Sequence, residues 1–218
     1  MDPINRLLEG NAQYARKKTE EDPTHFEQLS KGQSPEVLWI GCADSRVPET
    51  TVCECKPGDI FVHRNIANCV HRDDINVASV VEYAVTHLKV QKVVVCGHTK
   101  CGGAVASLAD GDLGETLNTW LHPTRELRRK HAAELAKLPN DDARAVRLAE
   151  LNVHLSIDVL EEHPAIKRAI NERGLTVEGL IYDIVNGQLR TLEIVGRGGG
   201  QLSNGLWQPN LYIHHFPK

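Results

Sequence analysis

Two cysteines and a histidine follow a run of valines in the stretch VVVCGHTKCGG, residues 93–103. Earlier in the chain, Cys42 directly follows the apolar segment EVLWIG. Thiolates and imidazoles are donors that favour zinc, whereas magnesium, calcium and manganese prefer oxygen. Cys42, His98 and Cys101 are therefore a candidate set of zinc ligands, and Asp44 is a candidate fourth partner.

Three protein ligands with an open fourth position are typical of a catalytic zinc rather than a structural one. Two other interpretations fit the same residues. The cysteines and the histidine can be ordinary core residues, or the cysteines can form a redox pair. The redox interpretation is the weaker one, because Cys96 and Cys101 are not spaced as a C-x-x-C motif. Spacing alone leaves all three open.

The zinc interpretation needs elements that bring its two segments together. Residues 36–41, 59–64 and 92–96 are short and apolar, which predicts buried strands. The unbroken β-branched run at 92–96 is typical of a parallel strand covered on both faces. Ligands of open α/β sheets bind beyond the carboxyl ends of the strands. Cys42 and the segment 98–101 would then meet, provided that their strands are neighbours.

The other segments predict an α/β fold, with a mainly parallel β-sheet flanked by helices and an N-terminal helical arm. One domain is expected over 1–218, with the arm at 1–34 and an irregular Gly-rich tail at 196–218. We expect helices at 4–18 and 73–88, helical structure over 114–163 with a break near Pro139 and a stop at Pro164, and strands at 175–185 and 189–195 around an Asn-Gly turn. The helix at 73–88 is apolar almost all round, which suggests a subunit interface.

Composition narrows the classes of function. Of the 218 residues, 41% are hydrophobic and 25% are charged, as in ordinary globular proteins. A net charge of −4 gives no broad attraction for nucleic acid or anionic membranes, so neither is an expected partner. The basic run RELRRK is expected to be a solvated helix face.

The compartment follows from two further features of the sequence. There is no apolar run of about 18 residues, and the amino terminus lacks the apolar core of a secretory signal. We therefore expect a cytoplasmic location. In that reducing compartment, six cysteines are ligands, nucleophiles or core residues rather than a disulfide framework. Cys53 and Cys55 are expected to be unpaired loop or core cysteines, with metal or redox chemistry as the alternative. Cys69 and Cys96 are expected to be interior.

Four blocks carry a resemblance to a known family. GCADSRVP, PGDIFVHRNIAN, SVVEYAV and VVVCGHTKCGG, in this order and spacing, resemble a β-class carbonic anhydrase, and the similarity extends over roughly residues 5–195. The resemblance implies one Zn²⁺ per subunit, held by Cys42, His98 and Cys101. It implies reversible hydration of CO2 to bicarbonate and a proton, by attack of zinc-bound hydroxide on CO2.

The resemblance also implies roles for residues around the metal. Asp44 would accept a hydrogen bond from the hydroxide, and Arg46 would hold Asp44 off the metal in a bidentate pair. The implied substrate pocket comprises Gln33, Phe61, Ile66, Tyr83 and Gly102. Gln33 and Tyr83 would come from the neighbouring subunit, which places the active sites at the interface of a homodimer or homotetramer. For Phe61 and Ile66 a plain core role is the alternative.

Some members of the family have a closed form, in which the aspartate takes the fourth zinc position, and a noncatalytic bicarbonate pocket. This chain has Trp39, Arg64 and Tyr182 at the matching places, which makes them a candidate regulatory site. The alternative is that Trp39 is a core residue and Arg64 a structural ion-pair partner.

Two other functions compete with the enzyme. One is a noncatalytic zinc-binding relative acting as a bicarbonate or CO2 sensor, and the other is a different zinc enzyme, such as a hydrolase or a deaminase. The H-x-E and P-C-x-x-C pattern of deaminases is absent from the sequence. Retention of the three candidate ligands together with Asp44 and Arg46 favours the carbonic anhydrase.

Overall fold

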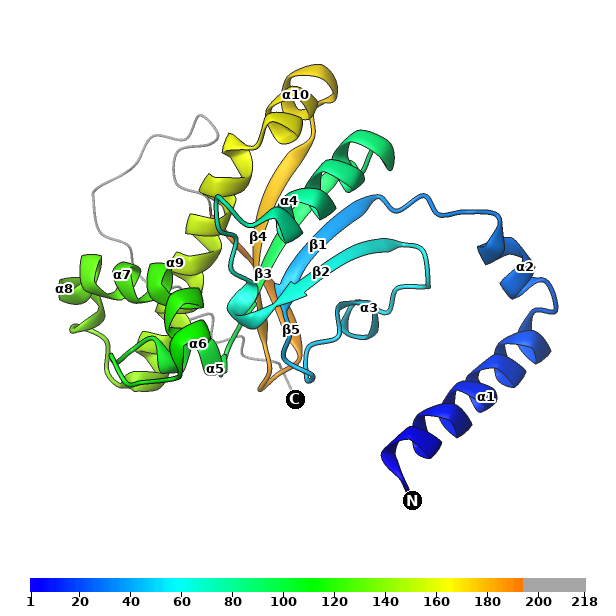
Figure 1. Cartoon of the computed structure of the whole chain (residues 1–218), viewed down its shortest axis with the longest axis horizontal. Coiled ribbons are helices and arrows are strands. Elements are labelled where there is room, and N and C mark those ends of the chain that lie inside the picture. Colours follow the sequence, from blue (N-terminus) through cyan, green and yellow to red (C-terminus); the bar gives the residue numbers. More distant parts are fainter. Residues whose placement is uncertain (194–218) are drawn as a thin grey trace, which may run out of the picture.

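One five-stranded sheet organises the chain. The computed structural model describes residues 1–193, so the expected tail at 196–218 and the end of the strand expected at 189–195 lie outside the described residues (Figure 1). The spatial order is β2-β1-β3-β4-β5. The strands are β1 (Val37–Cys42), β2 (Ile60–Asn65), β3 (Lys92–His98), β4 (Thr176–Asp183) and β5 (Gln188–Leu192).

The first four strands in this order pair in parallel, and β5 pairs antiparallel with β4 across the Asn186-Gly187 turn. Gly187, the last residue before β5, has a φ of 73°, a left-handed conformation that glycine adopts without steric cost. The mainly parallel sheet and the strands expected along the chain are therefore confirmed. The zinc interpretation required the strands before Cys42 and His98 to be neighbours, and this is also confirmed, because β1 and β3 are adjacent.

Helices connect and flank these strands, and they differ from expectation in two places. The helices are α1 (Pro3–Glu21), α2 (His25–Ser30), α3 (Glu49–Val52), α4 (Ile75–Glu82) with the π-helix η2 (Tyr83–His87), α5 (Gly102–Ala106), α6 (Glu115–Trp120), α7 (His122–Lys130), α8 (Ala132–Leu135), α9 (Asp141–Glu162) and α10 (Pro164–Arg173), and a 3-10 turn, η1 (Ile66–Asn68), follows β2. The region 114–163 is thus broken into several helices. α9 ends at Glu162, so the stop expected at Pro164 is confirmed. Pro164 then begins α10, a helix that was not expected, at a position where the missing N–H of a proline costs nothing.

The break near Pro139 is confirmed, and a capping residue begins the next helix after it. The Asn140 side chain accepts a hydrogen bond from the Ala143 N–H at 2.9 Å and so begins α9. Asp74 caps α4 in the same way, accepting from the Asn76 N–H at 2.9 Å.

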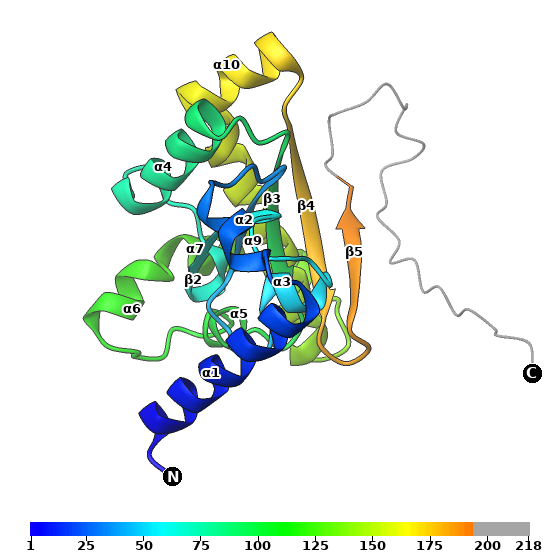
Figure 2. The same ribbon diagram turned by 90° about the vertical axis from the view of Figure 1, so that its right-hand side faces the viewer.

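The main core lies between one face of the sheet and the helices α4, α9 and α10. Leu38, Val93 and Ile181 are fully buried there, against side chains such as Val81 and Ile157. Figure 2 shows α4 and α10 on the same side of β3 and β4. The opposite face carries a smaller cluster built on Trp39, Val94 and Cys96. β3 is therefore covered on both faces, as its β-branched run predicts.

The helices α1 and α2 project away from this body (Figure 1). α1 has no buried residue, and Ile4, Leu7 and Leu8 on its apolar side are exposed. Within residues 1–193, every helix is too short or too polar to cross a bilayer.

The basic run on α7 is only in part the solvated face that was expected, since Glu126, Arg129 and Lys130 are exposed. Arg125 is only 8% exposed and donates to the Gly111 carbonyl at 2.7 Å. Arg128 donates to the Leu108 carbonyl at 2.9 Å and pairs with Asp110. These guanidinium groups satisfy the carbonyls of the loop between α5 and α6, a role that a charge pattern alone does not reveal.

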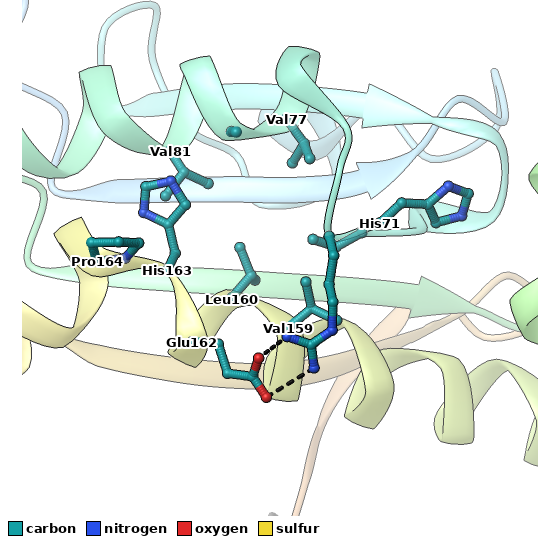
Figure 3. A pocket seen from close by; sticks show the side chains of 11 residues that line it. His71, Val77, Val81, Val159, Leu160, Glu162, His163 and Pro164 are labelled. Carbon is teal, nitrogen blue, oxygen red and sulfur yellow. Dashed lines mark hydrogen bonds and ion pairs between the residues drawn. The ribbon is translucent and has the colours of Figure 1, made fainter.

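A cavity of about 220 Å³ lies between α4 and the junction of α9 with α10 (Figure 3). Val77, Val81 and Leu160 contribute to its apolar lining, and Arg72 pairs with Glu162 at its edge. This cavity is distinct from the candidate metal ligands, which lie at the carboxyl ends of β1 and β3.

Candidate metal centre

The site is positioned by the parallel pairing of β1 with β3. Their register aligns Gly41 with Cys96, so Cys42 and His98 extend from the same edge of the sheet. A short loop returns the chain from His98 to Cys101, the residue that precedes α5.

The donor atoms of Cys42, His98 and Cys101 all lie within 4.8 Å of one another. The three residues are 8%, 1% and 3% exposed. A cluster of two sulfurs and one nitrogen, buried and convergent, is the arrangement that a tetrahedral metal ion with one open position requires.

The imidazole of His98 provides the sharpest test of whether a metal fits. Its Nδ1 lies 2.9 Å from the Thr99 carbonyl, so Nδ1 carries the proton and Nε2 carries the lone pair. Nε2 is buried and has no hydrogen-bond partner in the part of the chain that the structure describes. A buried nitrogen without a partner is costly, and metal-bound histidines commonly donate their second N–H to a carbonyl. The residues present therefore fit a metal.

The two thiols of the site differ from the other buried cysteines. The neighbouring Cys101 and His98 lower the pKa of Cys42, and the neighbouring Cys42 raises the pKa of Cys101. Two adjacent thiolates repel each other, so without a cation only one of them ionises readily. By contrast, burial raises the pKa of Cys69 to about 11 and raises that of Cys96, which marks both as inert core residues.

Asp44 and Arg46 form the bidentate pair that the sequence predicts. Nε of Arg46 donates to Oδ1 of Asp44 at 2.9 Å, and Nη2 donates to Oδ2 at 2.7 Å. These hydrogen bonds hold the pKa of Asp44 well below its usual range, so the group is an ionised acceptor. Oδ2 lies 3.9 Å from Nε2 of His98, so Asp44 borders the donor cluster while Arg46 restrains it.

The loop between the ligands is shaped by two backbone features. Lys100 has a φ of 57°, a left-handed conformation that is uncommon for a lysine. Its carbonyl accepts from Arg46 at 3.2 Å, and its ammonium group pairs with Asp142 at 2.6 Å. At Gly103 a Cβ would lie 2.8 Å from Cβ of Ala67, whereas at Gly102 it would meet nothing within 4 Å. The tight approach is therefore at Gly103.

Arg64 donates hydrogen bonds to the backbone of the segment that carries Cys42 and Asp44. Its Nε donates to the Cys42 carbonyl at 2.9 Å and its Nη2 to the Asp44 carbonyl at 2.6 Å. The buried carboxylate of Glu49 lies 3.7 Å from the same Nε. Trp39 is buried in the cluster on this face of the sheet, and Tyr182 packs against that cluster. In these contacts Trp39 is a core residue and Arg64 is a structural ion-pair partner, which is the alternative to a regulatory site.

The expected pocket residues divide into two groups. Ile66 is 43% exposed and borders the metal loop, since its Cγ2 lies 3.4 Å from the position of a Cβ on Gly103. Phe61 pairs with Leu38, four residues before the position that pairs with Cys42, which is roughly 13 Å along the strand. Its ring packs on Tyr83, with centroids 5.7 Å apart.

Gln33 belongs with the second group. It lies in the exposed segment before the amino end of β1, the end opposite to Cys42. One chain therefore brings Ile66 to its own metal ligands but does not bring Phe61 there.

A mainly parallel sheet with a buried Cys2His donor set at the carboxyl ends of its strands defines the class as an α/β protein whose donor set could hold a metal ion. Comparisons with known proteins specify the family. The carbonic anhydrase family model matches residues 37–189. A carbonic anhydrase of Emericella nidulans is 42% identical over 191 residues, which cover 87% of this chain and 83% of the relative.

Solved structures agree with this comparison. A tetrameric β-carbonic anhydrase of Sordaria macrospora superposes with a TM-score of 0.86 at 48% identity, over 88% of this chain and 98% of the other. The β-carbonic anhydrase CafA of Aspergillus fumigatus also gives 0.86, at 49% identity over 88% and 92% of the two chains. The chain belongs to the β-carbonic anhydrase family, and it is a carbonic anhydrase.

The two adjacent glycines give a first prediction. We expect Gly103→Ala to lower the free energy of unfolding by about 1–3 kcal/mol, because the new methyl group would overlap Ala67. Gly102→Ala is the matched control, since its methyl group enters open space and should change stability by less than about 0.5 kcal/mol. Urea unfolding of both variants checks this, and equal losses would contradict the close approach.

Proposed function

We propose that this chain hydrates CO2 reversibly to bicarbonate and a proton, using one Zn²⁺ per subunit held by Cys42, His98 and Cys101. The observation that carries the proposal is the buried cluster of these three donors, with Nε2 of His98 left without a partner among residues 1–193. Family membership supports the reaction and favours catalysis over a noncatalytic sensor.

The donor set selects the metal. Two thiolates and an imidazole favour zinc over magnesium, calcium or manganese, and three protein ligands leave a position for a small molecule. When bound, zinc would act as a Lewis acid that lowers the pKa of water towards neutrality.

Asp44 orients the nucleophile in this proposal. An ionised carboxylate can only accept hydrogen bonds, so Asp44 would accept a hydrogen bond from the attacking oxygen and thereby direct a lone pair of that oxygen at carbon. Arg46 engages both carboxylate oxygens and so keeps Asp44 from acting as a metal ligand in this arrangement.

The substrate pocket requires a second copy of the chain. CO2 is apolar, and Ile66 supplies an apolar wall beside the ligands of its own chain. Because Phe61 packs on Tyr83, we infer that both come to the site from the neighbouring subunit, together with Gln33. The expectation placed only Gln33 and Tyr83 on the neighbouring subunit, and this proposal adds Phe61 to them.

Self-association is supported by two further observations. The apolar residues of α1 are exposed in the single chain, and burying them against another subunit would be favourable. The relatives from Sordaria macrospora are tetrameric. We therefore propose a homodimer or homotetramer with active sites at the interface. A cytoplasmic location is also proposed, because all six cysteines are unpaired.

A bicarbonate site at Trp39, Arg64 and Tyr182 remains part of the proposal. Arg64 already engages Glu49 and two loop carbonyls, so an anion would have to displace one of these partners. Release of the Asp44 carbonyl would loosen the loop that carries Asp44, which would couple the anion to the metal centre.

Metal content and activity test the central proposal. The purified chain should contain about one zinc per subunit and hydrate CO2 in a stopped-flow assay. Cys42→Ser removes a ligand, so zinc affinity should fall by more than the roughly 10–100-fold typical of losing an outer contact, and activity should fall with it. Cys55→Ser, outside the donor cluster, is the matched control. Full activity of metal-free protein would refute the proposal.

Mixed oligomers test which subunit contributes Phe61 and Tyr83, the aromatic wall of the proposed pocket. A Cys42→Ser chain keeps Phe61 and Tyr83, whereas a Phe61→Ala, Tyr83→Ala chain keeps the ligands. A dimer of the two would contain one complete site out of two if the wall comes from the partner, and it should recover about half of the parent activity. The control carries all three substitutions in one chain and is mixed with itself. Recovery no greater than in this control would place the wall within one chain.

Replacement of Trp39 tests the regulatory site. Trp39→Val should weaken inhibition by bicarbonate at low pH while zinc content stays unchanged, because the substitution removes one wall of the proposed pocket. Activity is measured against bicarbonate concentration for both proteins. Identical inhibition curves would remove Trp39 from any regulatory role.

A further inference from the structure

The segment Ile66–Cys69 turns sharply just after β2, and its backbone is strained. We refer to it as the 66–69 corner. Ala67 has a φ of 60° and Asn68 a φ of 48°, two successive left-handed residues that are not glycine. Such conformations cost free energy and persist only where the surroundings hold them. Both residues are almost completely buried.

Side chains from elsewhere hold this corner in place. Each of its four consecutive backbone carbonyls accepts a hydrogen bond from a side chain. From Ile66 to Cys69, the donors are Trp120 Nε1 at 2.9 Å, Asn152 Nδ2 at 2.8 Å, Ser156 Oγ at 3.3 Å and Asn65 Nδ2 at 2.8 Å. Two of these donors, Asn152 and Ser156, lie one turn apart on α9.

The corner packs directly against the metal ligands. Ala67 and Cys69 share a buried cluster with Cys42 and Cys101. Ala67 is also the residue that would overlap a side chain on Gly103, two residues beyond Cys101. The corner therefore forms part of the packing around both candidate thiolates.

Asn152 is the donor best placed to maintain that conformation. It is 3% exposed, and its amide group donates to the carbonyl of the left-handed Ala67. Its Oδ1 accepts from the Thr124 hydroxyl at 3.4 Å and lies 3.8 Å from Sγ of Cys69. Since only an NH2 group can donate to a carbonyl, the orientation of the amide is determined. An aspartate of the same size would oppose the Ala67 carbonyl with an acceptor.

We propose that Asn152 is a positioning residue for the metal centre. It holds the 66–69 corner in its strained form against Cys42 and Cys101, and thereby keeps the three donors converged. Without it, the backbone at Ala67 relaxes, and the packing behind the thiolates loosens. The proposal rests on the zinc site proposed above.

Metal retention tests this role with a readout independent of activity. Asn152→Ala and Asn152→Asp are loaded with Co(II), and their thiolate-to-cobalt absorption and their rate of metal loss to a chelator are compared with those of the parent. We expect metal loss at least about tenfold faster and a shifted absorption spectrum, as for loss of an outer contact to a metal site. If Asn152→Ala does not fold, Asn152→Asp carries the comparison because it preserves volume.

A matched control separates positioning from general destabilisation. Ile157 lies on the same helix, but its side chain packs in the main core and is not part of the cluster that the corner forms with the ligands. Of Ile157→Val and Ile157→Ala, the control is the variant whose loss of thermal stability matches that of the Asn152 variant. It should release cobalt within about twofold of the parent rate. Equal rates in the Asn152 and Ile157 variants would overturn the proposal. A parent that binds no Co(II) or Zn(II) would instead overturn the zinc site itself.

Discussion

Parallel pairing between β1 and β3 is the contact on which the rest of the structure depends. It joins a cysteine from one strand end to a histidine and a cysteine that follow another, 56 residues or more along the chain. Burying two thiols and an imidazole so closely is unfavourable unless a cation binds them, because the thiolates repel each other and Nε2 of His98 loses its hydrogen bond to water. The sheet therefore creates a site whose polar groups are best satisfied by a metal.

Much of the surrounding structure restrains this site. Arg46 donates hydrogen bonds to both carboxylate oxygens of Asp44, and Arg64 donates to the carbonyls on either side of Ala43. The left-handed conformations at Lys100, Ala67 and Asn68 each cost roughly 1–3 kcal/mol. Strain concentrated around three buried donors is consistent with a rigid metal site rather than with ordinary core packing.

The sequence was sufficient for the α/β class and the strands, because apolar runs and turn residues are local patterns. It predicted convergence of the ligands only on the condition that β1 and β3 are neighbours, which the structure supplies. The sequence was not sufficient for features that depend on tertiary contacts. α9 ends before Pro164 as expected, but the helix α10 that begins at Pro164 was not expected from the sequence. No residue type signals a positive φ at Lys100 or Ala67. The contact between Phe61 and Tyr83 joins segments 22 residues apart and is invisible to periodicity.

X-ray absorption at the zinc edge of the purified protein tests the central claim most directly, because it counts the atoms bound to the metal. The account predicts two sulfurs near 2.3 Å and one imidazole nitrogen near 2.0 Å, at roughly the usual zinc distances, with a light atom completing four-coordination. A shell with only oxygen and nitrogen, or with four sulfurs, would contradict it.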